Sequence, residues 1–149
     1  MAHDHPALLE ESDAAVAYVI EAEKVFNSLR RLIGQLSGLL ILAETRTLRN
    51  APDLADLATA RRQWAETADA AARLDGPGRL ADHAGRLQHA ARHVGAALET
   101  MSGRGLDAGE AADLAARHLR HGYRLLQSAA DPRAGLAMID MSEACCRGH

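Results

Sequence analysis

Apolar side chains recur through most of this chain at alternating steps of three and four residues. Such steps keep one face of an α-helix turned toward a neighbouring helix. The composition agrees, because only 3% of the residues are aromatic, and alanine and leucine favour helices whereas sheets prefer β-branched and aromatic residues. The sequence therefore predicts an all-α protein. In its first long segment the apolar stripe consists of Ala15, Val19, Ala22, Phe26, Leu29, Ile33, Leu36, Leu40 and Ala43.

Clusters of glycine, proline, asparagine and aspartate interrupt this pattern at residues 50–53, 75–78 and 102–107, and more weakly at 131–132. Glycine commonly follows the end of a helix and proline suits the first turn, so each cluster marks a helix end and a new start. Short connections make successive helices antiparallel. We therefore predict one domain over residues 1–149, an antiparallel up-down-up-down four-helix bundle with a long first helix and a short C-terminal fifth helix. The predicted helices span about 13–49, 52–74, 77–101, 107–130 and 132–144.

The first predicted helix is longer than a bundle of this size requires. At the α-helical rise it would extend roughly 55 Å, whereas the next three would extend about 35 Å each. It either breaks between Gly34 and Gly38 or projects beyond the bundle. Its apolar stripe is also broad enough to serve both an internal core and an external partner. We therefore predict a homodimer through this helix; the alternative is that the glycines only mark a kink.

The charge balance and the chain start limit the partners and the compartment. The formal net charge is -3 with neutral histidines, so no excess of basic residues indicates nucleic acid as a partner. The first residues lack the basic and apolar regions of a secretory signal, and no apolar run approaches the roughly 20 residues that span a membrane. The two cysteines are adjacent, which disfavours a structural disulfide between them. We predict a soluble cytoplasmic protein that binds neither nucleic acid nor membrane.

Two of the eight histidines, His89 and His93, are four residues apart in the third predicted helix. They share a helix face, and this spacing can chelate a metal ion. However, they fall outside the apolar stripe of that helix and lie beside Arg86 and Arg92. This context predicts a solvated outer face rather than a metal site.

His118 and His121 in the fourth predicted helix belong to a second stripe next to the main apolar one. They are predicted to flank the core, as is His83 in the third helix. The sequence does not set the register between these helices. Two interpretations stay open: half-buried histidines hydrogen-bonded to carboxylates or carbonyls, and ligands of a metal or haem.

The C-terminal residues combine Cys145, Cys146 and His149 with two methionines. Thiolate and thioether ligands favour copper(I) or zinc(II), and vicinal thiols are good redox targets. The predicted metal-ligand set is therefore Cys145, Cys146, His149, His118 and His121, with copper or zinc as the first cofactors to consider and haem as the second. The alternative is a C-terminal segment that packs on the bundle without binding a metal.

Signatures of catalysis are missing from the sequence. It contains no Glu-x-x-His pair, no His-Glu-x-x-His, no phosphate-binding glycine loop and no Gly-x-Ser-x-Gly. We therefore predict no catalytic residues, and an enzyme using histidines with Glu44, Glu66 or Glu99 ranks last. The predicted function is a non-enzymatic helical-bundle module acting through protein–protein association. The alternative is a copper-, zinc- or haem-binding protein that uses the C-terminal cysteines and the histidines of the fourth helix.

Overall fold

The computed structural model describes residues 5–45, 54–103 and 108–131 of the chain. The all-α prediction is confirmed. The predicted fifth helix, residues 132–144, lies outside the described residues. No helix within the described ranges is long and apolar enough to cross a membrane. The helices are α1 (His5–Thr45), α2 (Leu54–Ala72), α3 (Leu80–Ser102) and α4 (Ala108–Ala129).

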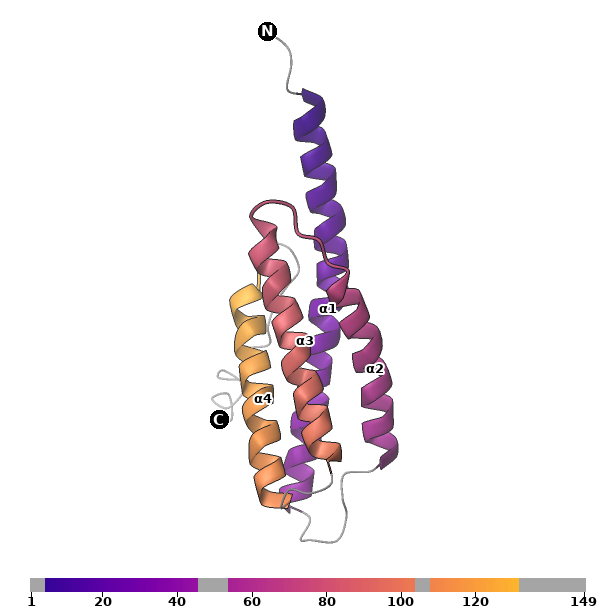
Figure 1. Cartoon of the computed structure of the whole chain (residues 1–149), viewed down its shortest axis with the longest axis vertical. Helices are drawn as coiled ribbons and strands as arrows, with labels where there is room; N and C mark the ends of the chain where they lie inside the picture. Colours follow the sequence, from indigo (N-terminus) through magenta and orange to yellow (C-terminus); the bar gives the residue numbers. More distant parts are fainter. Residues whose placement is uncertain (1–4, 46–53, 104–107, 132–149) are drawn as a thin grey trace, which may run out of the picture.

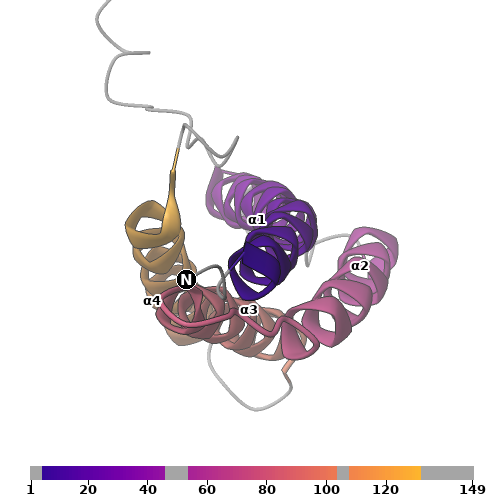
Figure 2. The same ribbon diagram turned by 90° about the horizontal axis from the view of Figure 1, so that it is seen from above.

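The four helices lie side by side, and each runs opposite to the one before it (Figure 1). Seen from above, α2, α3 and α4 form an arc, and α1 lies on the concave side of that arc (Figure 2). As a result α1 contacts all three other helices, and so does α3. The core therefore sits between the middle of α1 and the inner faces of the arc.

The core consists of the apolar stripes that the spacing predicts. The central position of α1 explains why it contributes half of the largest fully buried side chains. Burial of one such side chain contributes about 1.5–3 kcal/mol relative to leaving it exposed. The largest fully buried side chains are Phe26, Leu29, Leu32 and Leu36 of α1, Leu87, Val94 and Leu98 of α3, and Leu126 of α4.

Helix α1 is continuous over 41 residues and passes through Gly34 and Gly38 without interruption. It begins at His5, well before the predicted start near residue 13. Pro6 explains the early start, because a proline in the first turn lacks only an N–H that would have no helical partner. The N-terminal part of α1 extends beyond the ends of the other helices (Figure 1).

The connection between α2 and α3 corrects two predicted boundaries. Helix α2 ends at Ala72 rather than 74, and α3 begins at Leu80 rather than 77. Gly78 explains the later start of α3, because its φ of 54° is left-handed and cannot belong to a right-handed helix. Pro77 therefore precedes the helix, and its carbonyl accepts a hydrogen bond from Leu80 N at 3.0 Å.

Side chains of α3 cap the C-terminal ends of α2 and α4. The last carbonyls of a helix have no partner within that helix. Gln88 Nε2 donates to the carbonyls of Ala71 (3.1 Å) and Leu74 (3.4 Å) at the end of α2. Arg86 Nη1 donates to the carbonyl of Ser128 (2.7 Å) near the end of α4. The N-terminal half of α3 therefore lies beside the C-terminal ends of α2 and α4.

Candidate functional sites

Three histidines meet where α3 packs on α4. His93 Nδ1 of α3 lies 3.3 Å from His118 Nδ1 of α4. The ring of His93 also stacks on that of His121, with centroids 5.3 Å apart and an interplanar angle of 25°. We call His93, His118 and His121 the histidine cluster. It is the densest group of imidazoles in the described part of the chain, and His89 precedes it by one turn of α3.

The position of His93 corrects the prediction from the sequence. His89 is exposed as predicted, but His93 is half-buried rather than on an outer surface. The apolar stripe of α3 that faces α1 is only part of the buried surface of α3. A second part is buried because α3 also packs on α4. His93 lies on this second buried flank between Ala90 and Ala97, both of which are fully buried.

The two histidines predicted to flank the core differ in their exposure. His118 is half-buried, whereas His121 is exposed. Burial lowers the pKa of His93 from its ordinary value, and His118, His121 and His89 lower it further because each would repel a charged His93. The hydrogen bond between the two Nδ1 atoms requires one N–H and one free lone pair. The neutral, lone-pair-bearing form is also the form in which imidazole binds metals.

The other predicted metal ligands, Cys145, Cys146 and His149, lie outside the described residues. The structure therefore does not place them relative to His118 and His121. Within the described ranges, no group of three or more histidine, cysteine, aspartate or glutamate side chains is arranged around a common metal position. The metal prediction based on the C-terminal residues thus stays a prediction.

His83 links three helices and, for this residue, confirms the interpretation of a half-buried histidine hydrogen-bonded to a carbonyl. His83 Nε2 of α3 lies 2.8 Å from the carbonyl of Ala129 at the end of α4. Because a carbonyl only accepts, Nε2 carries the proton and Nδ1 is left as an acceptor. The hydroxyl of Tyr18 in α1 donates to that Nδ1 at 2.7 Å. Tyr18 is buried, and its role was not predicted, because only its place among the apolar residues of α1 distinguishes it in the sequence.

The burial of Tyr18 leads us to predict a loss of stability at high pH. Burial raises its pKa from 10.0 to about 12, so the unfolded chain loses this proton at a lower pH than the folded chain. The stabilisation is complete below pH 10 and is lost as the pH rises toward 12, by up to about 2–3 kcal/mol. A titration of phenolate absorbance in a Tyr123→Phe background checks this. Ionisation of Tyr18 near its ordinary pKa in the folded protein would contradict the burial of its hydroxyl.

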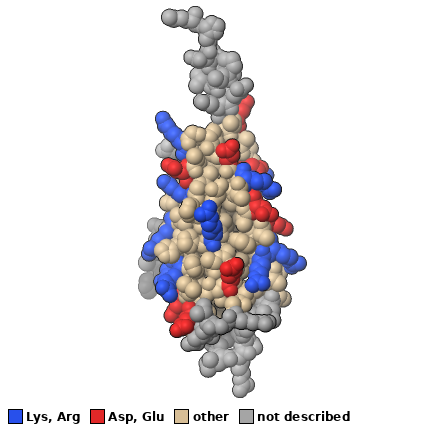
Figure 3. All heavy atoms as spheres, viewed as in Figure 1, with Lys and Arg blue, Asp and Glu red and all other residues tan. Residues whose placement is uncertain are grey.

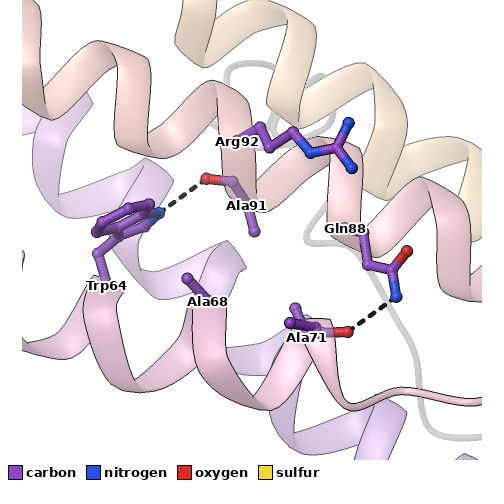
Figure 4. Close-up of a pocket in the computed structure, with 7 residues that line it drawn as sticks. Trp64, Ala68, Ala71, Gln88, Ala91 and Arg92 are labelled. Carbon is purple, nitrogen blue, oxygen red and sulfur yellow. Dashed lines mark hydrogen bonds between the residues drawn. The ribbon is translucent and has the colours of Figure 1, made fainter.

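A cleft of about 380 Å³ lies between α2 and α3. Trp64 and Gln88 stand at its two ends, with small alanines between them (Figure 4). The indole is held in place, since Trp64 Nε1 donates to the carbonyl of Ala91 at 2.7 Å. The polar groups that the cleft offers are one amide and the exposed guanidinium of Arg92. Its lining residues are Trp64, Ala68, Ala71, Ala72, Gln88, Ala91 and Arg92.

A second cleft of about 320 Å³ lies between α1 and α2 and is more polar. Glu66 lines it, but Glu44 and Glu99 are exposed elsewhere on the surface. Neither cleft contains a histidine, so neither pairs an imidazole with a carboxylate for acid–base chemistry. The second cleft is lined by Ser28, Arg31, Leu32, Gln35, Gln63, Glu66 and Thr67.

Exposed large apolar side chains concentrate on α1. Within the described ranges these are Val16 (57% exposed), Ile20 (50%), Ile41 (60%) and Leu42 (49%). At 100° per residue they fall on the side of α1 opposite the core. Gly34 and Gly38 belong to the same side, and a Cβ atom at either would meet nothing within 4 Å. We call this surface the outer face of α1.

Comparison with protein-family models, with curated proteins and with solved structures finds no match for this chain. Its function therefore has to be inferred from the side chains themselves. The histidine cluster and the outer face of α1 are the two features that the core does not account for.

Charged side chains do not define a further site on the face seen in Figure 3. Basic and acidic residues are interspersed over its height. Lys24 and Glu21 form an exposed ion pair at 2.9 Å, and pairs of this kind contribute little to stability.

Proposed function

We propose that this chain, an up-down-up-down four-helix bundle, is a non-enzymatic module that acts by protein–protein association. The partner is a second copy, bound through the outer face of α1. The observation that carries the proposal is that Val16, Ile20, Ile41 and Leu42 lie on one side of one helix, as one pair toward each end of that side. Scattered single apolar residues are normal on a surface, whereas a face that gathers them indicates an interaction site.

The distribution of residues along this face favours an antiparallel pair of α1 helices. Large apolar residues lie toward the two ends of the face, and Gly34 and Gly38 lie inside it. In an antiparallel pair centred between Lys24 and Gly34, Val16 of each copy meets Leu42 of the other, and Ile20 meets Gly38. The open space at Gly38 then accepts the Ile20 side chain. Both contacts occur twice, as a two-fold interface requires.

The strength of such a dimer can be bounded. Burying the exposed part of four side chains on each copy contributes on the order of 8 kcal/mol. Association costs at least about 4 kcal/mol in lost translational and rotational freedom. The remainder is at most about 4 kcal/mol, which corresponds to a dissociation constant of about 1 mM or weaker. Experiments must therefore extend to high protein concentration.

The test is light scattering over a dilution series that reaches millimolar protein. The wild-type chain is expected to change from monomer to dimer. Val16→Glu with Ile20→Glu should weaken the dimer at least about 10-fold, because burying each unpaired carboxylate costs more than the 1.4 kcal/mol of one such factor. The matched control places the same two charges at exposed alanines of α2, as Ala58→Glu with Ala65→Glu, and should leave association unchanged.

Two results would refute the proposal. One is a wild-type monomer at every concentration. The other is a dimer that the α2 control weakens as much as the α1 variant does. Circular dichroism of both variants shows whether the helices are retained, so that a loss of dimer is not confused with unfolding.

A further inference from the structure

We propose that the histidine cluster is a binding site for a divalent transition-metal ion, with zinc(II) as the metal that fits it best. The ligands are His93 of α3 and His118 and His121 of α4. This site is separate from the outer face of α1, so it stands or fails independently of the dimer. It also requires none of the C-terminal residues.

The spacing of two ligand atoms fits a shared metal. His93 Nδ1 and His118 Nδ1 lie 3.3 Å apart. Zinc–nitrogen bonds of about 2.0–2.1 Å at a tetrahedral angle place two ligand nitrogens roughly 3.3–3.4 Å apart. The packing of α3 on α4 therefore holds the two nitrogens at a separation that suits a shared metal. A metal ion would replace the hydrogen bond that now joins them, and both rings would turn so that their lone pairs point at the metal instead of at each other.

The third ligand needs only a side-chain rotation. His121 is three residues after His118, so both project from neighbouring positions on one face of α4. Its ring now stacks on His93 instead of converging with the other two, which is why no three-ligand group is already assembled. Because His121 is exposed, turning its ring leaves no cavity in the core.

The donor set determines the class of metal. Neutral imidazoles suit zinc, copper and nickel, whereas magnesium and calcium require oxygen ligands. Three imidazoles leave a fourth tetrahedral position for water.

The experiment uses the full chain without an affinity tag, in a background that removes other ligands near the chain ends. This background carries His3→Gln, His5→Gln, Cys145→Ser, Cys146→Ser and His149→Gln. Titration calorimetry with zinc(II) should show one ion bound per chain with micromolar affinity. Cobalt(II) should give the visible absorbance of a tetrahedral nitrogen-ligated site.

Single substitutions assign the ligands. His93→Gln, His118→Gln and His121→Gln are each expected to weaken zinc binding at least about 10-fold, since even a residue that only supports a ligand contributes a factor of that size. His89→Gln is the matched control, because His89 is an exposed histidine one turn from the cluster. Because it is outside the ligand set and exposed, its replacement should weaken zinc binding less than the replacement of any of the three ligands.

The proposal is overturned by the absence of saturable zinc binding at micromolar concentration in this background. It is also overturned if His118→Gln binds as tightly as the background protein, or if His89→Gln loses as much affinity as His118→Gln. Circular dichroism and the melting temperature without metal separate a lost ligand from a lost fold. A zinc-dependent rise in melting temperature that disappears in His118→Gln supports the site by a second readout.

Discussion

Replacing Phe26 with alanine is expected to lower the free energy of unfolding by about 3–5 kcal/mol. Phe26 is fully buried and lies on the part of α1 that the arc of α2, α3 and α4 encloses. Removing its ring leaves a cavity that three rigid helices cannot close. Because domains of this size are stable by only about 5–15 kcal/mol, the loss is a large fraction of the total. Urea unfolding followed by circular dichroism measures it.

The matched control is Ile20→Ala on the same helix. Ile20 is 50% exposed, so its truncation should change the free energy of unfolding of the monomer by less than about 0.5 kcal/mol. Both variants are measured at low protein concentration, where the proposed dimer does not contribute. Equal destabilisation by the two substitutions would show that α1 is not embedded in the bundle as described.

Replacing Gly95 with alanine is expected to destabilise the protein by about 1–3 kcal/mol, as overpacking of a core does. The Trp64 ring lies against the backbone of α3 at this position, and an alanine Cβ would come within 2.5 Å of Trp64 Cζ2. The indole is also fixed by its hydrogen bond to Ala91. It therefore cannot move aside without losing that bond. Urea unfolding followed by circular dichroism measures the change.

Two companion variants separate the clash from the ordinary preference of helices for alanine. Gly85→Ala is in the same helix, and its Cβ would meet nothing within 4 Å. It should stabilise the protein by up to about 1 kcal/mol. In a Trp64→Leu background, Gly95→Ala should likewise become neutral or stabilising. If Gly95→Ala remains equally destabilising without the indole, the proposed packing of Trp64 on Gly95 is wrong.

The two clefts pair no imidazole with a carboxylate. The cleft beside Trp64 is lined mainly by alanines, and the cleft beside Glu66 contains no histidine. In the histidine cluster, the side chains that contact His93 are other imidazoles.

Much of the core could be read from the sequence, because an α-helix has a fixed period. Once Phe26, Leu29 and Leu36 are placed on one helix, their spacing alone puts them on one face. The ends of the helices were harder to predict from the sequence, as Gly78 illustrates. Whether a glycine near a proline starts a helix or adopts a left-handed φ depends on the path between the two helices, which the local sequence does not specify.

The helical class, the main apolar stripe of each helix and a first helix longer than the others follow from the amino-acid sequence alone. These features depend on spacing and propensity within one segment. Which helices pack against each other, and how far each is shifted along its axis, became clear only from the tertiary structure. This packing places His93 in contact with His118 instead of on the predicted outer surface. It also brings Tyr18 within hydrogen-bonding distance of His83, 65 positions away in the chain. The physical reason is that periodicity fixes direction around a helix axis, whereas the packing of side chains between helices fixes their register along it.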